Sequence, residues 1–248
     1  MEALLYSFLA GTSTVVGALL LFLIGEPGKR TLAGLLGFAG GIMLGISVFE
    51  LLPEAVAFGS LGTALTGFVL GAAMMYGLDR VLPHSHMSTG DDLVVENPKK
   101  MGRQQSPILR TGYLVLFGIA MHNLPEGLAI GAGLEASPDV GLLIAVAIGL
   151  HNIPEGLAMS GPLRAGGMPM GKVLLFTLLA GLVTPIGTAI GLLVMQAAPA
   201  MVGGAMAFAA GAMVYIVNDE LVPQSNEMNS HLANAGLISG ILLAFALL

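Results

Sequence analysis

The chain has 248 residues, of which 55% are hydrophobic and only 10% are charged. Soluble domains carry about a quarter charged residues, and the charges here are clustered between long apolar runs. The composition therefore excludes an ordinary soluble domain and predicts an integral membrane protein. The sequence contains no cysteine, which excludes disulfides and thiolate metal ligands.

Eight apolar segments are long enough to cross about 30 Å of hydrocarbon as helices. They cover residues 3–24, 31–57, 60–82, 109–134, 139–162, 172–195, 200–223 and 231–248. The first segment lacks a basic start and a clear cleavage site, so we interpret it as a span rather than a signal peptide. Residues 83–108 are polar and form the expected long loop, and residues 1–248 are expected to form a single transmembrane domain.

The positive charges predict the orientation of these spans. All nine Lys and Arg residues fall in odd-numbered connections or at span ends beside them: Lys29, Arg30, Arg80, Lys99, Lys100, Arg103, Arg110, Arg164 and Lys172. Positive charge is retained in the cytoplasm. We therefore expect a multi-pass protein of the cell (inner) membrane, with loop 83–108 in the cytoplasm and both termini on the extracytoplasmic side.

Two parts of the sequence resemble each other at an offset of 170 positions. GIMLGISVFELLPEA from Gly41 matches GAMVYIVNDELVPQS from Gly211, and AGTSTVVG from Ala10 matches AGLVTPIG from Ala180. The paired spans cross in opposite directions, as in the inverted repeats of secondary transporters. We predict an all-α fold in which spans 1–3 and 6–8 are inverted repeats around spans 4 and 5, although spans 3 and 8 show no convincing match.

The two central spans carry related polar motifs, HNLPEG from His122 and HNIPEG from His151. Each histidine lies near the middle of its span, and the glutamate four positions later, Glu126 or Glu155, lies on the same helical face. An ionised carboxylate at mid-bilayer costs roughly 2.5–3.5 kcal/mol, and a divalent cation offsets this charge. The motifs therefore predict a metal site of two imidazoles and two carboxylates.

Nitrogen and oxygen ligands in this number suit zinc, while iron, manganese, cobalt and cadmium stay open because raw affinity separates such ions poorly. Asn123 and Asn152 could offer amide oxygens to a second or hydrated ion. Pro125 and Pro154 cannot donate hydrogen bonds within their helices and so open the backbone beside the ligands. The alternative interpretation is that these polar residues only hold helices together, but two copies of the motif at midplane depth argue against it.

With these paired motifs and eight spans, the whole chain resembles the ZIP (Zrt/Irt-like) family of divalent-metal transporters, and its short loops resemble bacterial-type members. The resemblance implies a metal site formed by His122, Asn123, Glu126, His151, Asn152 and Glu155. It also implies an elevator-like movement and a homodimer. One position departs from the family, because Thr184 stands where many bacterial-type members have a glutamate for a second metal. A neutral hydroxyl is a weak ligand, so we expect one tightly bound ion and a weaker or absent second ion.

Further carboxylates flank the central motifs. Glu50 and Glu54 lie towards the expected outer end of span 2, and Asp219 and Glu220 towards the inner end of span 7. We interpret them as transport-pathway residues that attract cations, with ordinary interfacial charge as the alternative. The family resemblance favours the pathway role most strongly for Glu220.

A pair of histidines, His84 and His86, stands beside the expected cytoplasmic loop. Many ZIP proteins have loop histidines that are thought to capture metal, so we interpret this pair as a candidate capture site. A plain solvated loop is the alternative.

Together these features predict a transporter that moves divalent cations, zinc foremost, into the cytoplasm, without a prosthetic group or a nucleic-acid partner. No GxxxxGK[ST] motif for ATP is present, so an ion gradient is expected to drive transport. An intramembrane zinc-dependent hydrolase is one alternative, although HExxH is absent. A metal sensor without transport is another, and a purely structural membrane protein would leave the doubled motif unexplained.

Overall fold

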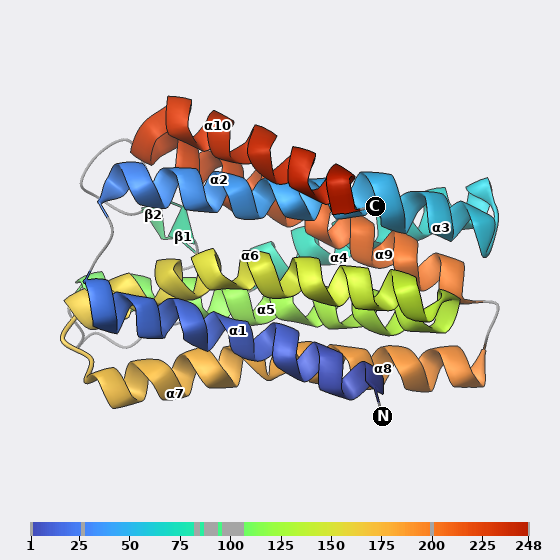
Figure 1. The fold of residues 1–248 in the computed structure, drawn as a ribbon, viewed down its shortest axis with the longest axis horizontal. Helices are drawn as coiled ribbons and strands as arrows, with labels where there is room; N and C mark the ends of the chain where they lie inside the picture. Colours follow the sequence, from blue (N-terminus) through green and yellow to red (C-terminus); the bar gives the residue numbers. More distant parts are fainter. Residues whose placement is uncertain are drawn as a thin grey trace.

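The computed structural model describes residues 2–25, 28–81, 85–86, 94–95, 107–198 and 201–247. Apart from one short pair of strands, the elements in these ranges are helices (Figure 1). Seven helical segments of the described chain are long and apolar enough to cross a membrane. The expectation of an all-α membrane protein is therefore confirmed.

The helices follow the predicted spans closely. The first part of the chain forms α1 (Glu2–Ile24), α2 (Lys29–Ile46), the π-helix η1 (Ser47–Leu51), α3 (Leu52–Ala57) and α4 (Leu61–Val81). The second part forms α5 (Pro107–Ala136), α6 (Pro138–Ala165), α7 (Met170–Gly181), α8 (Val183–Ala197), α9 (Val202–Ile216), the π-helix η4 (Val217–Leu221) and α10 (Val222–Leu247). The two π-helices join their neighbours without a gap, so each lies within a longer helical segment.

The helices differ from the predicted spans at two places. The expected sixth span is divided at Leu182 into α7 and α8. The cause is Pro185, which has no N–H for the carbonyl of Gly181 and whose ring crowds that carbonyl. In the last segment, Asn229 has non-helical backbone angles (φ −168°, ψ 101°) inside α10. Its Oδ1 atom accepts a hydrogen bond from the N–H of Leu232 at 3.0 Å, as an N-cap residue does where a new helix begins.

The expected loop 83–108 contains a short strand pair that the sequence analysis did not predict. Strand β1 (Ser85–His86) pairs antiparallel with β2 (Val94–Val95), so that Ser85 faces Val95 and His86 faces Val94. The rest of the loop up to Pro107, including His84, lies outside the described residues.

The helices pack into two groups, which Figure 1 shows as the lower and upper parts of the view. In the first bundle, α5 and α6 pack against each other and against α1, α7 and α8. In the second bundle, α2 packs against α10, and α9 packs against α3 and α4. The bundles meet where α9 contacts α5 and where α2 contacts α6. The two motif-bearing helices thus each face a helix of the second bundle.

Candidate metal site

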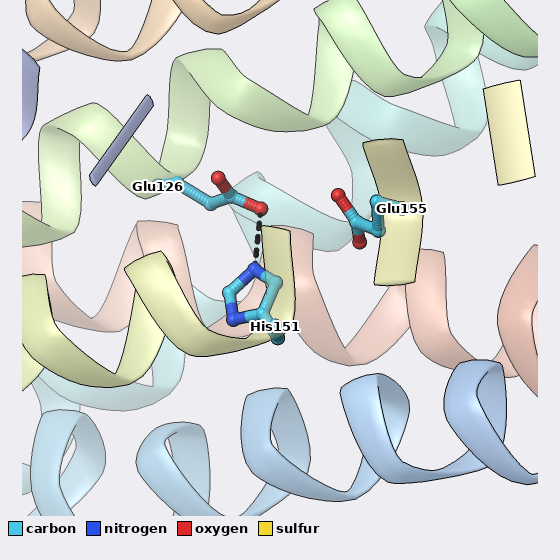
Figure 2. A group of neighbouring side chains, drawn as sticks. All are labelled: Glu126, His151 and Glu155. Atoms are coloured by element: carbon cyan, nitrogen blue, oxygen red, sulfur yellow. Dashed lines mark hydrogen bonds and ion pairs between the residues drawn. The ribbon is translucent and has the colours of Figure 1, made fainter. Parts of the chain in front are cut away.

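The centre of the site is a group of three buried side chains from α5 and α6. One ligand atom from each of Glu126, His151 and Glu155 can be chosen so that all three lie within 4.8 Å of one another. The Nε2 atom of His151 lies 3.0 Å from Oε1 of Glu126. Figure 2 shows this contact, with the carboxyl group of Glu155 pointing towards the same space from the other side. All three residues have an exposed fraction of 0%, so the two motifs meet inside the protein.

The remaining histidine of the motifs contacts the second bundle. Nε2 of His122 lies 3.3 Å from Oε2 of Glu220, which belongs to η4. The charges of His122, His151, Glu126 and Glu220 all act on Glu155, so these five side chains form one electrostatic cluster. The side chain of His122 is 2% exposed and that of Glu220 is 23% exposed. Glu220 therefore lies at the edge of the cluster and connects it to a more accessible region.

Several polar atoms of the cluster have no hydrogen-bond partner among the described residues. They include both carboxylate oxygens of Glu155, Oε2 of Glu126 and Nδ1 of His122. A buried polar atom without a partner costs about 1–3 kcal/mol, and such atoms are rare in folded proteins without an explanation. One oxygen of each carboxylate and one imidazole nitrogen lie within 4.8 Å of one another, and such nitrogen and oxygen atoms are the chemistry of a zinc-type ligand set.

The two motif asparagines hold the site to its neighbours through their amide nitrogens. Nδ2 of Asn123 donates to the carbonyl of Ala180 in α7 at 2.8 Å, and Nδ2 of Asn152 donates to the carbonyl of Ala10 in α1 at 3.0 Å. The Oδ1 atoms of both are buried and have no hydrogen-bond partner in the described structure. Each asparagine thus has its nitrogen fixed and its oxygen available to a cation.

Close backbone contacts fix the same helices beside the carboxylates. A Cβ at Gly127 would collide with the carbonyl of Thr184, and a Cβ at Gly156 would collide with the carbonyl of Thr14. The hydroxyl of Thr188 also donates to the carbonyl of Gly127 at 2.7 Å. Because each glycine directly follows a motif glutamate, these contacts set the depth at which the two carboxylates lie. Pro125 and Pro154 lie inside helices that continue through them.

The other candidate residues lie around this centre. Thr184 is fully buried near the start of α8, and its hydroxyl has no hydrogen-bond partner among the residues the structure describes. Glu50 in η1 and Glu54 in α3 are half-buried and lie close enough for their charges to interact. Asp219 in η4 is half-buried beside Glu220. The backbone of His86 lies in β1, whereas His84 lies outside the described residues.

Sequence reasoning placed Glu220 on the pathway but did not find its contact with His122. Glu220 lies in the π-helix η4. A π-turn changes which residues of a helix face a neighbour, and no residue in VNDEL predicts such a turn. The carbonyl partners of the asparagines were also missed. The sequence did contain a feature that could have indicated them, because Ala10 and Ala180 are the first residues of the two segments that match at the 170-residue offset.

The fold and the buried cluster define a class: a multi-pass α-helical membrane protein with histidine and carboxylate groups gathered between its central helices. Residues 81–248 match the sequence profile of the ZIP zinc transporter family. The chain is 36% identical over 230 residues to the zinc transporter ZupT of Escherichia fergusonii. The aligned region covers 91% of this chain and 87% of that protein. It is 37% identical, with the same coverage, to the zinc transporter ZupT of two Escherichia coli strains, IAI39 and HS. The chain therefore belongs to the ZIP family, which confirms the resemblance seen in the sequence.

Proposed function

We propose that this protein transports divalent metal cations, with zinc as the main substrate, and that it imports them into the cytoplasm. It is a transporter rather than an enzyme, as membership of the ZIP family indicates. The observation that carries the proposal is the fully buried group of Glu126, His151 and Glu155 between two central helices. Two carboxylates and an imidazole need a positive partner at that depth, and a divalent cation supplies it.

The proposed ligands are the imidazoles of His122 and His151 and the carboxylates of Glu126 and Glu155. Support comes from the carboxylate oxygens that have no partner among the described residues. The unpartnered Oδ1 atoms of Asn123 and Asn152 are proposed to complete the coordination or to bind water of a hydrated ion. This set of nitrogen and oxygen ligands suits zinc and also accepts iron, manganese, cobalt or cadmium.

The proposed topology has eight spans in the inner membrane of the cell. Both termini lie on the extracytoplasmic side, and loop 83–108 lies in the cytoplasm. The last apolar segment, Val202–Leu247, has 46 residues. As one straight helix it would be about 69 Å long, more than twice the thickness of the hydrocarbon layer. The break at Asn229 supports its division into two antiparallel spans, and in Figure 1 α9 and the end of α10 run in opposite directions.

An inverted repeat of spans 1–3 and 6–8 is supported by paired features at the offset found in the sequence. The π-helices η1 (Ser47–Leu51) and η4 (Val217–Leu221) lie 170 positions apart. The carbonyls that accept from the two motif asparagines, those of Ala10 and Ala180, lie at the same offset.

Spans 3 and 8, which showed no match in sequence, have matching contacts. A Cβ at Gly71 would collide with the carbonyl of Phe208, and a Cβ at Gly240 would collide with the carbonyl of Phe38. Phe38 and Phe208 are again 170 positions apart. These contacts support spans 3 and 8 as the third pair of the repeat.

The proposed movement is a displacement of the first bundle against the second, as the elevator-like mechanism of the family implies. The closest backbone contacts described above join helices of the same bundle, which supports each bundle as a rigid unit. They are the contacts at which an added Cβ would collide, namely those of Gly127, Gly156, Gly71 and Gly240. Glu50 and Glu54 are proposed to attract cations on the outer side, and Asp219 and Glu220 on the inner side. The homodimer implied by the family and the loop histidines as a capture site remain predictions.

Uptake of radiolabelled divalent cations into liposomes that contain only this protein tests the function. The wild-type protein is expected to accumulate zinc, and His122→Ala and Glu155→Ala are expected to abolish uptake while still inserting as folded proteins. Glu135→Gln changes an exposed glutamate on the same helix as His122 and serves as the matched control.

The alternatives give different results in that assay. A sensor would bind zinc without accumulation inside the liposomes, and a hydrolase would need a substrate bond to cleave and would show no flux. Uptake at the wild-type rate by folded His122→Ala and Glu155→Ala proteins would contradict the proposed site.

A further inference from the structure

The central cluster is asymmetric although the elements that build it are paired. His122 contacts Glu220 of the second bundle, whereas His151 contacts Glu126 within its own bundle. Under the pairing of HNLPEG with HNIPEG and of η4 with η1, the counterpart of Glu220 is Glu50. No hydrogen bond or ion pair involves Glu50 in the part of the chain that the structure describes.

The packing of the helices supports this pairing of residues. η4 continues α9, which contacts α5, the helix of His122, and η1 continues α2, which contacts α6, the helix of His151. The oxygens of Glu220 lie 3.5 Å from the position of a Cβ on Gly118, four residues before His122. The corresponding residue before His151 is Ala147, which is buried. Glu50 therefore lies at the end of the helical segment that packs against the helix of His151, as Glu220 lies at the end of the one that packs against the helix of His122.

We propose that Glu50 and Glu220 alternate as partners of the two motif histidines during transport. In the structure, the contacts are His122 with Glu220 and His151 with Glu126. In the second state, Glu50 contacts His151 and Glu155 contacts His122. This inference rests on the proposed transport function and assigns Glu50 a positioning role for the transport step.

The second state would use the groups that have no partner in the first. Both carboxylate oxygens of Glu155 lack a hydrogen-bond partner among the described residues, and Glu50 makes no hydrogen bond or ion pair with any of those residues. An exchange of partners keeps one carboxylate of the second bundle bound to the first bundle in each state. The two states are then close in free energy, which a transporter needs in order to move between them.

Cross-linking between introduced cysteines tests the exchange. The native chain contains no cysteine, so no native thiol can react with the cross-linker. The full-length protein in liposomes would carry either G118C/E220C or A147C/E50C and be treated with a short bis-methanethiosulfonate reagent, which needs no metal oxidant. Both pairs are expected to cross-link. In a protein with all four cysteines, mass spectrometry is expected to find either cross-link in a molecule but not both.

The matched control is V48C/A147C, because Val48 lies in the same π-helix and its side chain is 47% exposed. It is expected not to cross-link. Failure of A147C/E50C to react while G118C/E220C reacts would overturn the proposal, as would both cross-links in one molecule. These readouts need no flux, so a wild-type protein that moves no metal would reject the proposed function independently of this result.

Glu50→Gln supplies a second test that does not depend on cysteine variants. Loss of a charge-assisted contact in one state is expected to slow zinc uptake about tenfold, while the zinc Kd stays within about twofold because Glu50 does not contact the site in the first state. Glu50→Asp is expected to restore most of the rate. Uptake by Glu50→Gln at the wild-type rate, or an equal loss of affinity and rate, would overturn the proposal.

Discussion

Nε2 of His122 lies 3.3 Å from Oε2 of Glu220, and this contact connects the two bundles. Within each bundle, close backbone contacts hold the helices together. The histidine belongs to a helix with a proposed ligand set, and the glutamate belongs to a π-helix of the opposite bundle. A displacement of one bundle against the other must change this distance. The contact is therefore both part of the charge balance of the site and a marker of the conformational state.

Glu220→Gln is expected to reduce zinc uptake about tenfold, because a neutral amide loses the charge-assisted contact with His122. Uptake by liposomes at several zinc concentrations measures the effect. The control is Glu227→Gln, which neutralises an exposed glutamate shortly after Glu220 in the chain and should leave uptake unchanged. An equal reduction in both variants would mean that surface charge, and not the contact with His122, is responsible.

Glu155→Gln is expected to weaken zinc binding about 100-fold, or about 3 kcal/mol, because it removes a buried charge from the proposed ligand set. Titration calorimetry in detergent measures this loss. Glu135→Gln removes the same charge from an exposed position on α5 and should bind zinc like the wild type. Unchanged affinity of a folded Glu155→Gln protein would exclude this carboxylate as a ligand.

Asn123→Asp is expected to lower the free energy of unfolding by about 1–3 kcal/mol, because the buried carbonyl of Ala180 loses its donor and then faces a carboxylate. Thermal unfolding in detergent without metal measures the change. Asn218→Asp is the matched control, since Asn218 makes a similar bond to the carbonyl of Val214 at an exposed site where water can replace it. Similar losses of unfolding free energy in both variants would show that the buried contact with Ala180 stabilises the protein no more than an exposed one.

Much of the architecture could be predicted from the sequence because membrane helices are constrained by length and hydrophobicity. The motifs also led to the buried group, since a helical spacing of four places His151 and Glu155 on one face. What the sequence could not supply was the relation between distant helices. The glutamate that contacts His122 lies in a π-helix, and the close packing of α4 on α9 and of α10 on α2 depends on glycines whose neighbours lie far away in the chain.

Gly156→Ala is expected to destabilise the protein by about 1–3 kcal/mol, because its new methyl group would meet the backbone of Thr14 in α1 and force the helices apart. The change would also move Glu155, so zinc affinity should fall with stability. Gly161→Ala on the same helix has open space at its Cβ and should be neutral or slightly stabilising. Thermal unfolding and zinc titration of both variants make the comparison. Equal stability would contradict the close approach of α1 and α6.

The number of tightly bound ions is expected to be one, because Thr184 offers a neutral hydroxyl at the position where the family resemblance implies a carboxylate in many members. Its Oγ1 is buried without a hydrogen-bond partner in the described structure, and this neutral atom contributes no charge to hold a second divalent ion. Equilibrium dialysis with radiolabelled zinc, combined with protein quantification, gives the stoichiometry. In Thr184→Ala the single tight ion is expected to remain, because its proposed ligands come from α5 and α6. Two equally tight ions in the wild type would show that Asn123 and Asn152 can support a second site without the missing carboxylate.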